Sequence, residues 1–265
     1  LCRHRYSYCH LLIMLELRLF ATQGRRLVGL ALFAVLGSVQ AASFSVSPVI
    51  ITLDSSNSIV AMTVRNSGSD TAVLQAQVND WSIHDNQEFY QPTTDLIVSP
   101  PVFEVEPGKT QIVRIGLRDT APQAVEQSFR VFFEQAPATP GSDSSSSSVA
   151  NTPLGVQVML RIGIPVFVKS TVPSTSKLVW NAQRLTDGRL RVEAENQGAA
   201  HSKISQIDVI HNNKAVASSN VLTYILPDSR RHWLLDVPAG ITAPYTIKVV
   251  TNDGVLETQV TASKP

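Results

Sequence analysis

Apolar and polar residues alternate along most of the chain after Ala42, and this period of two is typical of half-buried β-strands. The clearest runs are Val60–Val64, Gln111–Leu117 and Phe129–Phe133. Clusters of Pro, Gly, Asp and Ser separate the runs at short intervals, and no long run has the period of an amphipathic helix. The pattern therefore predicts an all-β chain built as β-sandwiches.

Two sandwich domains are expected. The first, residues 42–168, ends in a long strand candidate that follows the serine-rich segment Gly141–Ser148. Residues 169–176 carry Ser, Thr and Pro and predict a linker. Residues 177–265 form the second domain, where Asn252-Asp253-Gly254 between two alternating runs predicts a hairpin.

Residues 1–41 have the pattern of a leader with a secretion signal, whose core runs from Arg25 to Ala41. Two arginines precede the apolar run Leu27–Gly37, and small residues follow it. The alternative is a membrane anchor, but the run is shorter than the about 20 residues that span a bilayer. We expect cleavage after Ala41 and no stable membrane insertion of the mature protein.

The leader also changes the charge and cysteine content. The chain of 265 residues has a net charge of +1, but residues 42–265 hold 17 basic and 20 acidic residues. This balance argues against a nucleic-acid partner, because proteins that bind nucleic acids usually carry a strong excess of basic residues. Both cysteines, Cys2 and Cys9, lie in the leader, so the mature core is expected to form without disulfides.

The mature sequence offers little chemistry for catalysis. It has no Gly-x-Ser-x-Gly elbow, no glycine-rich phosphate loop and no His-Glu-x-x-His motif. Its histidines show no metal-ligand spacing, and they are expected to be ordinary surface or turn residues. We therefore expect a protein that is not an enzyme and that holds no metal or cofactor.

The strand candidate Leu154–Val168 is unusual because it is long and follows the serine-rich segment. Its apolar residues fall on one face, because side chains alternate along a strand: Val156, Val158, Leu160, Ile162 and Ile164. Pro165 lacks an N–H, which indicates an edge position. A half-buried sandwich strand is one interpretation. The other is an edge strand that pairs with a partner protein, since an exposed apolar edge needs cover.

The mature sequence resembles the periplasmic pilus-assembly chaperones of the chaperone–usher pathway. The resemblance rests on a series of short motifs in a fixed order: Thr63–Asn66, Pro100–Phe103, Pro107–Lys109, Gln111–Arg114, Glu126–Arg130, Ile164–Phe167, Leu178–Trp180 and Tyr224–Arg231. Each motif is weak alone, but their order and spacing after a signal sequence are specific. The resemblance implies two immunoglobulin-like β-sandwich domains in a boomerang arrangement.

The resemblance also implies a function in the periplasm. Such chaperones bind a pilus or fimbrial subunit that lacks its last strand, and they complete it by donor-strand complementation. They then deliver it to an outer-membrane usher. By this correspondence the donor residues are Val156, Val158, Leu160 and Ile162.

One departure concerns the anchor of the subunit's C-terminal carboxylate. In the best-known branch an Arg and a Lys hold it, but Pro48 and Pro165 stand at those positions here. The sequence therefore looks closer to the archaic or spore-coat-type branch. Arg114 and Arg161 are the candidate anchors, because a guanidinium binds a carboxylate in bidentate fashion. The alternative is that Arg114 and Arg161 are solvated strand residues. Arg130 is a weaker third candidate.

A second class of protein stays open. A secreted two-domain Ig-like module that serves adhesion or forms part of a fibre would share the strand pattern. A fibre subunit would carry an N-terminal donor extension and one incomplete sandwich, whereas two strand-rich domains with an internal donor candidate favour the chaperone.

Overall fold

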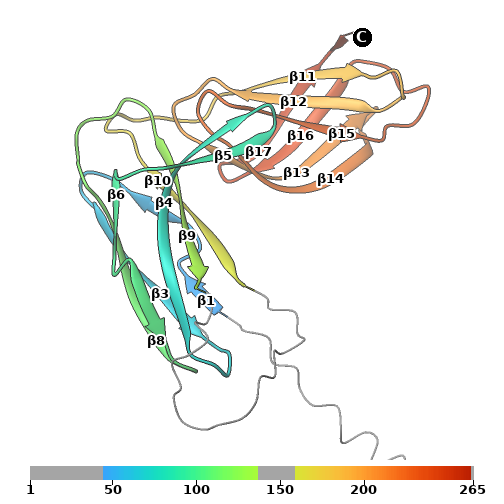
Figure 1. Ribbon diagram of the computed structural model, residues 1–265. Coiled ribbons are helices and arrows are strands. Elements are labelled where there is room, and N and C mark those ends of the chain that lie inside the picture. Colours follow the sequence, from blue (N-terminus) through green and yellow to red (C-terminus); the bar gives the residue numbers. More distant parts are fainter. Residues whose placement is uncertain (1–43, 137–158, 264–265) are drawn as a thin grey trace, which may run out of the picture. The chain divides into compact units, whose positions relative to one another are not determined.

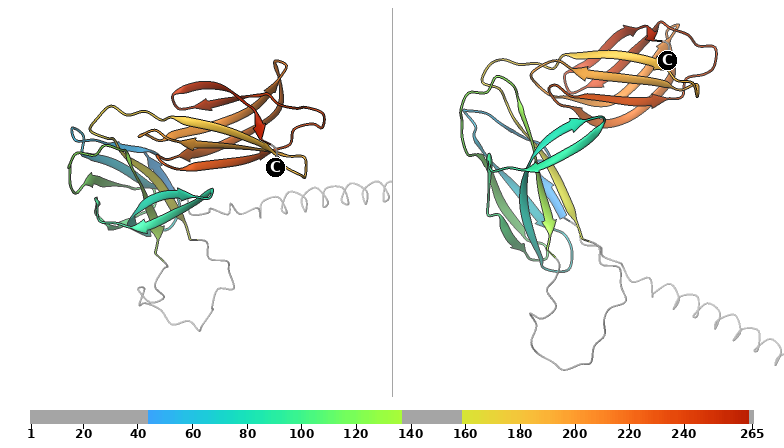
Figure 2. Two further views of the ribbon diagram at one scale, coloured as in Figure 1. Left: turned by 90° about the horizontal axis from the view of Figure 1, so that it is seen from above. Right: turned by 45° about the horizontal axis from the view of Figure 1, so that its top comes forward.

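A computed structural model describes residues 44–136 and 159–263, and every helix or strand assigned in these ranges is a β-strand (Figure 1). The expected all-β fold is therefore confirmed. The predicted leader, residues 1–41, and the serine-rich segment lie outside the described residues. Two groups of strands form two sandwiches, β1–β10 and β11–β18, which Figure 2 shows from two further sides.

The first sandwich consists of two sheets, here called sheet I and sheet II. Sheet I has the strand order β1-β3-β8-β6, and sheet II has the order β2-β10-β9-β4-β5, with β7 also paired to β4. The strand bounds are β1 Phe44–Ser47, β2 Ile51–Leu53, β3 Ile59–Asn66, β4 Ala72–His84, β5 Gln87–Pro92, β6 Leu96–Ser99, β7 Val102–Val105, β8 Thr110–Leu117, β9 Gln127–Gln135 and β10 Arg161–Val168.

The second sandwich consists of sheets III and IV. Sheet III has the order β15-β12-β11-β18, and sheet IV has the order β14-β13-β16-β17. The bounds are β11 Leu178–Arg184, β12 Leu190–Asn196, β13 Ser202–His211, β14 Lys214–Ile225, β15 Arg230–Leu235, β16 Tyr245–Thr251, β17 Gly254–Val260 and β18 Ala262–Ser263. The predicted hairpin forms between β16 and β17, with Thr251 paired to Gly254.

Each sandwich closes over its own apolar core, because alternate side chains of the facing sheets turn inward. In the first sandwich, Val113 and Ile115 of β8 meet Val131 and Phe133 of β9, and all four are fully buried. Val192 and Ile247 are equally buried in the core of the second sandwich. The alternation found in the sequence therefore marks the core faces of these strands.

A buried asparagine ends the corresponding strand in each sandwich, Asn66 in β3 and Asn196 in β12. In both, Nδ2 donates to two carbonyl oxygens and Oδ1 accepts a glycine N–H two residues later. The bonds join Asn66 to Asp70, Val105 and Gly68, and Asn196 to Ala200, Ile225 and Gly198. Each side-chain amide thus uses both of its donors and its acceptor, so the two sandwiches share one device for holding their strand ends.

Candidate functional site

Strand β10 lies at the edge of sheet II for most of its length. It pairs along all eight residues with β9, but β2 covers its other side only at Val166–Val168. Over Arg161–Pro165, no strand within the described residues pairs with that side. The strand was expected to begin at Leu154, but in the described part it begins at Arg161, close to where β9 ends at Gln135 and pairing stops.

The backbone of this open edge has groups ready for pairing. The Gln135 N–H donates to the Leu160 carbonyl at 3.0 Å, so the peptide groups of Leu160 face β9. Because peptide groups alternate in direction along a strand, those of Arg161 and Gly163 face the open edge. Pro165 also turns its nitrogen toward that edge, where its missing N–H costs no bond to β9. The edge can therefore accept another strand.

The apolar face of β10 points into the sandwich. Ile164, Val166 and Val168 are buried in the core, Ile162 packs against it while partly buried, and Leu160 is half-buried. Of the four predicted donor residues, Val156 and Val158 lie outside the described residues. Leu160 and Ile162 thus continue the core face into the part of β10 that lacks a second neighbouring strand. Each keeps apolar surface there that a partner could cover.

Arg161 lies on the other face of β10, above Phe132 of β9. Its guanidinium carbon is 3.8 Å from the centroid of the Phe132 ring, and its Nε is 2.7 Å from Glu134. Gly163 makes this packing possible, because a Cβ there would come within 2.8 Å of the Phe132 ring. Arg161 remains half-exposed beside the open edge, so a ligand that pairs there can reach its guanidinium, which it would share with Glu134.

Arg130, on β9, occupies the centre of the same outer face. It lies 4.1 Å from the Trp81 ring centroid and 3.3 Å from Glu88. Glu88 also accepts hydrogen bonds from Arg231 at 2.7 Å and from the Tyr90 hydroxyl. The pKa of Tyr90 is raised, mainly by burial and next by its hydrogen bond to Glu88. One carboxylate therefore faces two guanidinium groups, which leaves an excess of positive charge.

Buried donors that have no hydrogen-bond partner among the described residues lie around Arg130. They are its own Nε, Trp81 Nε1 and Asn79 Nδ2, on neighbouring positions of β9 and β4. Buried donors are normally hydrogen-bonded, so their grouping beside an excess positive charge favours an anionic acceptor such as a carboxylate. Sequence reasoning found only the arginine, since no sequence pattern shows which tryptophan and asparagine lie beside it.

Arg114 lies apart from these residues. It sits on β8, on the outer face of sheet I, between Ala61 of β3 and Ser99 of β6. Sheets I and II pack against one core, so the two predicted anchors, Arg114 and Arg161, lie on opposite outer faces of the sandwich. The structure does not bring them together.

The C-terminal end of β10 is held by contacts with residues of the second sandwich. Phe167 packs with Trp81, Ile83 and Leu226 in a separate buried cluster. The His201 ring stacks on Phe167, and its Nδ1 lies 2.6 Å from the carboxylate of Glu126. His201 is therefore a junction residue and not the ordinary surface residue expected from the sequence, where nothing marked its partner 75 positions away.

Arg231 makes a second contact of this kind. It donates to the Asn86 carbonyl and to Glu88, both at 2.7 Å, at the tip of the β4–β5 hairpin. Its side chain is only 9% exposed, and Asn86 Oδ1 also accepts the His232 N–H at 3.0 Å. These bonds fix the hairpin that carries Glu88 and Tyr90, so they position the outer face of sheet II.

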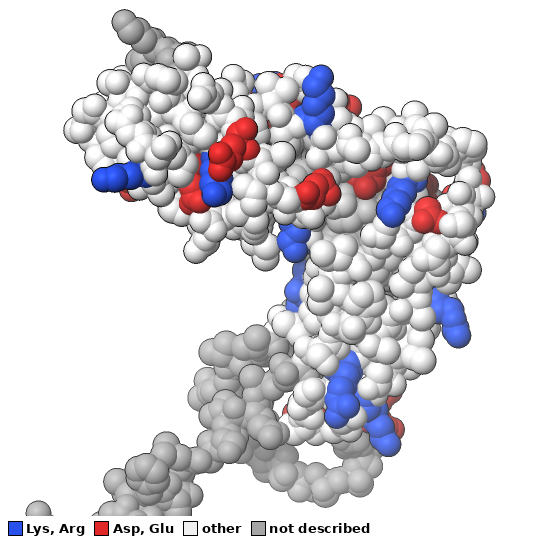
Figure 3. All heavy atoms as spheres, turned by 180° about the vertical axis from the view of Figure 1, so that it is seen from behind, with Lys and Arg blue, Asp and Glu red and all other residues white. Residues whose placement is uncertain are grey.

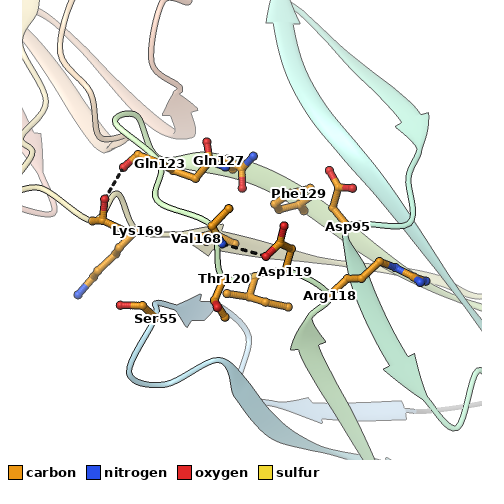
Figure 4. A pocket seen from close by; sticks show the side chains of 13 residues that line it. Ser55, Asp95, Arg118, Asp119, Thr120, Gln123, Gln127, Phe129, Val168 and Lys169 are labelled. Carbon is orange, nitrogen blue, oxygen red and sulfur yellow. Dashed lines mark hydrogen bonds between the residues drawn. The ribbon is translucent and has the colours of Figure 1, made fainter.

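A cavity of about 180 Å³ lies near the point where β10 ends (Figure 4). Asp95 and Asp119 line it together with Arg118 and Lys169, and their charges are mixed. Within the described residues no three His, Cys, Asp or Glu side chains are placed to hold a metal ion. No helix of the described part is long and apolar enough to cross a membrane. The open edge of β10 is therefore the stronger candidate site.

Known proteins resemble the chain in family and in fold. Residues 43–173 match the family of pili and flagellar-assembly chaperones, PapD N-terminal domain. No curated protein matches the sequence.

Three solved structures illustrate the likeness in fold. A chain of the CsuC–CsuE chaperone–tip adhesion subunit pre-assembly complex, from archaic chaperone–usher Csu pili of Acinetobacter baumannii, is 19% identical; the match covers 84% of this chain and 100% of that chain, with a TM-score of 0.60. The E. coli chaperone DraB is 20% identical, with 84% and 97% covered and a TM-score of 0.54.

The third structure, Salmonella enterica SafA pilin in complex with the SafB chaperone, is 14% identical, with 84% and 98% covered and a TM-score of 0.54. These likenesses show the fold of two-domain Ig-like chaperones. The family match covers the first sandwich and the residues that follow it, so residues 43–173 belong to the family of pili and flagellar-assembly chaperones, PapD N-terminal domain.

Proposed function

We propose that the protein is a periplasmic chaperone that binds pilus or fimbrial subunits by donor-strand complementation and delivers them to an outer-membrane usher. The open edge of β10 over Arg161–Pro165 is the observation that carries this proposal. Extended segments add to such edges through main-chain hydrogen bonds, and alternate side chains then select the partner. The known structures of similar fold include a chaperone with a pilin and one with a tip adhesion subunit.

The donor residues in this proposal are Val156, Val158, Leu160 and Ile162. Ile162 and Leu160 keep apolar surface at the open edge, and the two valines precede them with the same alternation. Burial of one such side chain contributes about 1.5–3 kcal/mol, so the four would contribute roughly 6–12 kcal/mol before the cost of ordering. A contribution of this size matters for holding a subunit, because association itself costs several kcal/mol.

The carboxylate anchor is proposed on the outer face of sheet II. Arg161 lies beside the open edge, and Arg130 has unpartnered buried donors around it. Arg114 stays a candidate anchor, but it lies on the outer face of the other sheet. The proposed activity is binding and not catalysis, and it needs no cofactor.

Co-purification tests the proposal. The tagged full chain is expressed with its neighbouring genes, and proteins that co-purify from the periplasm are identified by mass spectrometry. We expect a near one-to-one complex with a small β-rich secreted protein. Leu160→Asp and Ile162→Asp should abolish capture, whereas Val255→Asp, at an exposed position of β17, should not.

Two results would contradict the proposal. Recovery of the chain alone would favour an adhesion or fibre module. Equal capture by all three variants would show that a subunit binds elsewhere. Circular dichroism and thermal unfolding of each variant establish that lost capture does not come from lost folding.

A further inference from the structure

The outer face of sheet I carries exposed apolar residues in register across three strands. Ile59 of β3 and Ile97 of β6 flank Gly116 of β8, and Ile112 lies further along β8. Their exposed fractions are 60%, 47% and 51% for Ile59, Ile97 and Ile112. Three isoleucines half-exposed on one sheet face form a surface that water solvates poorly.

Two arginines share this face. Arg114 lies between the row of Ile59 and the row of Ile112, and Arg65 follows on β3 opposite Thr110. Both are exposed, and within the described residues neither guanidinium has an ion-pair or hydrogen-bond partner. The four strands of sheet I contain no Asp or Glu at all. The face is therefore positive and partly apolar.

The other three sheets differ in this respect, because each contains ion pairs between its own strands or along one strand. The pairs are Arg161–Glu134 and Arg130–Glu88 on sheet II, Arg191–Glu193 and Arg230–Glu195 on sheet III, and Lys248–Glu257 on sheet IV. Figure 3 shows one side of the molecule, where the first sandwich is mostly white with separate blue side chains and little red. An ordinary solvated face would mix both signs, as the other sheets do.

We propose that the outer face of sheet I, defined by Ile59, Ile97, Ile112, Arg65 and Arg114, docks a partner protein through a segment that carries carboxylates among apolar side chains. Each arginine would bind a carboxylate in bidentate geometry, and the isoleucines would be covered between them. Charge complementarity selects this occupant: a second copy of the same face would place arginine against arginine.

The docking face does not depend on the donor-strand site. The open edge of β10 belongs to sheet II, and the docking face is the outer side of sheet I, beyond the shared core. A partner can therefore occupy it while a subunit is paired to β10. The inference goes beyond the proposed function and would stand if the donor-strand assignment failed.

Site-specific photocrosslinking tests it. A photoreactive amino acid replaces Ser99, which is exposed beside Arg114, in the full chain expressed with its neighbouring genes. The control carries the same group at Asn220, exposed on β14. We expect an adduct from Ser99 only, with a segment whose sequence mixes Asp or Glu with apolar residues.

Charge reversal then decides the matter. Arg65→Glu combined with Arg114→Glu should reduce the adduct about tenfold, because both carboxylate contacts become repulsive. Lys177→Glu combined with Lys214→Glu makes the same change in net charge elsewhere on the surface and should leave the yield unchanged. Replacing the acidic residues of the crosslinked segment with Lys should restore the adduct to the reversed variant.

The proposal is overturned if the adduct forms equally in the reversed variant, if the Ser99 group links only to another copy of this chain or to lipid, or if no adduct forms. Every substituted residue is exposed, so thermal unfolding should match the parent.

Discussion

The ring of His201 stacks on the ring of Phe167 with the centroids 3.6 Å apart and the planes 10° from parallel. This contact joins the end of β10 to the second sandwich, and Glu126 holds the other side of the imidazole. Glu126 is almost fully buried and also accepts the His201 N–H at 2.9 Å. The imidazole thus stacks on an aromatic ring and also provides a hydrogen-bond partner for a buried carboxylate.

Replacing His201 with Ala should therefore destabilise the protein. The substitution removes the stacked ring and leaves Glu126 one hydrogen bond short, at a cost of about 1–3 kcal/mol in the free energy of unfolding. Urea unfolding of the parent and variant measures it. His211→Ala, at the end of β13, is the control, and an equal loss in both variants would contradict the role of the junction.

A second prediction concerns pH. Burial first, and then the neighbouring Arg191 guanidinium, lowers the pKa of His232 from its usual value near 6.5. The unfolded chain therefore takes up this proton more readily than the folded protein. The stability that neutral His232 contributes is present above the usual pKa and is lost as pH falls below it.

His232→Gln should accordingly flatten the decline in unfolding free energy between about pH 7 and pH 5. Urea titrations at several pH values measure the slope. An unchanged slope would show that other groups dominate in this range, and His84→Gln, which lies on β4, serves as the matched control.

Gly163 is expected to tolerate no side chain. A Cβ there would lie 2.8 Å from the Phe132 ring, which packs under Arg161 and against Tyr90. Gly163→Ala should force the ring to move and cost about 1–3 kcal/mol. Gly116→Ala is the comparison, because the atom it meets, 3.0 Å away, belongs to the movable Ile59 side chain. Thermal unfolding should show the larger loss at Gly163.

The anchor assignment predicts an order of effects on subunit capture. Arg161→Ala should lower the yield of the complex, because the guanidinium lies beside the open edge. Arg114→Ala should lower it only if the anchor lies on sheet I. Quantifying the co-purified subunit separates the two, and an unchanged yield from Arg161→Ala would remove that residue from the site.

The sequence predicted where strands form better than it predicted which strands pair with one another. Alternation along Gln111–Leu117 and Phe129–Phe133 marked the core faces, because strand periodicity is a local property. Which sheet a strand joins depends on pairing between distant segments, so the sequence could not separate Arg114 from Arg161. For the same reason it missed His201, whose partners Phe167 and Glu126 are brought to it by the fold.

Asn196 offers a prediction in which charge, and not size, decides the outcome. Its Oδ1 accepts two backbone N–H groups, from Lys177 and Gly198, and its Nδ2 donates to two carbonyl oxygens, while the residue is fully buried. Asn196→Asp keeps the shape and the accepting oxygen, but it turns a second oxygen toward the two carbonyls. The ionised form should therefore cost about 2–4 kcal/mol.

The cost should shrink in acid. Burial and the facing carbonyls disfavour the charge, so the folded variant holds the proton on the introduced carboxyl group more tightly than the unfolded chain does. The variant's deficit relative to the parent is then largest at neutral pH and falls as pH drops toward about 4. Urea unfolding at about pH 7 and pH 4.5 measures it, with exposed Asn220→Asp as the control. A deficit that stays constant across this range would mean that lost hydrogen bonds, and not the buried charge, cause the instability.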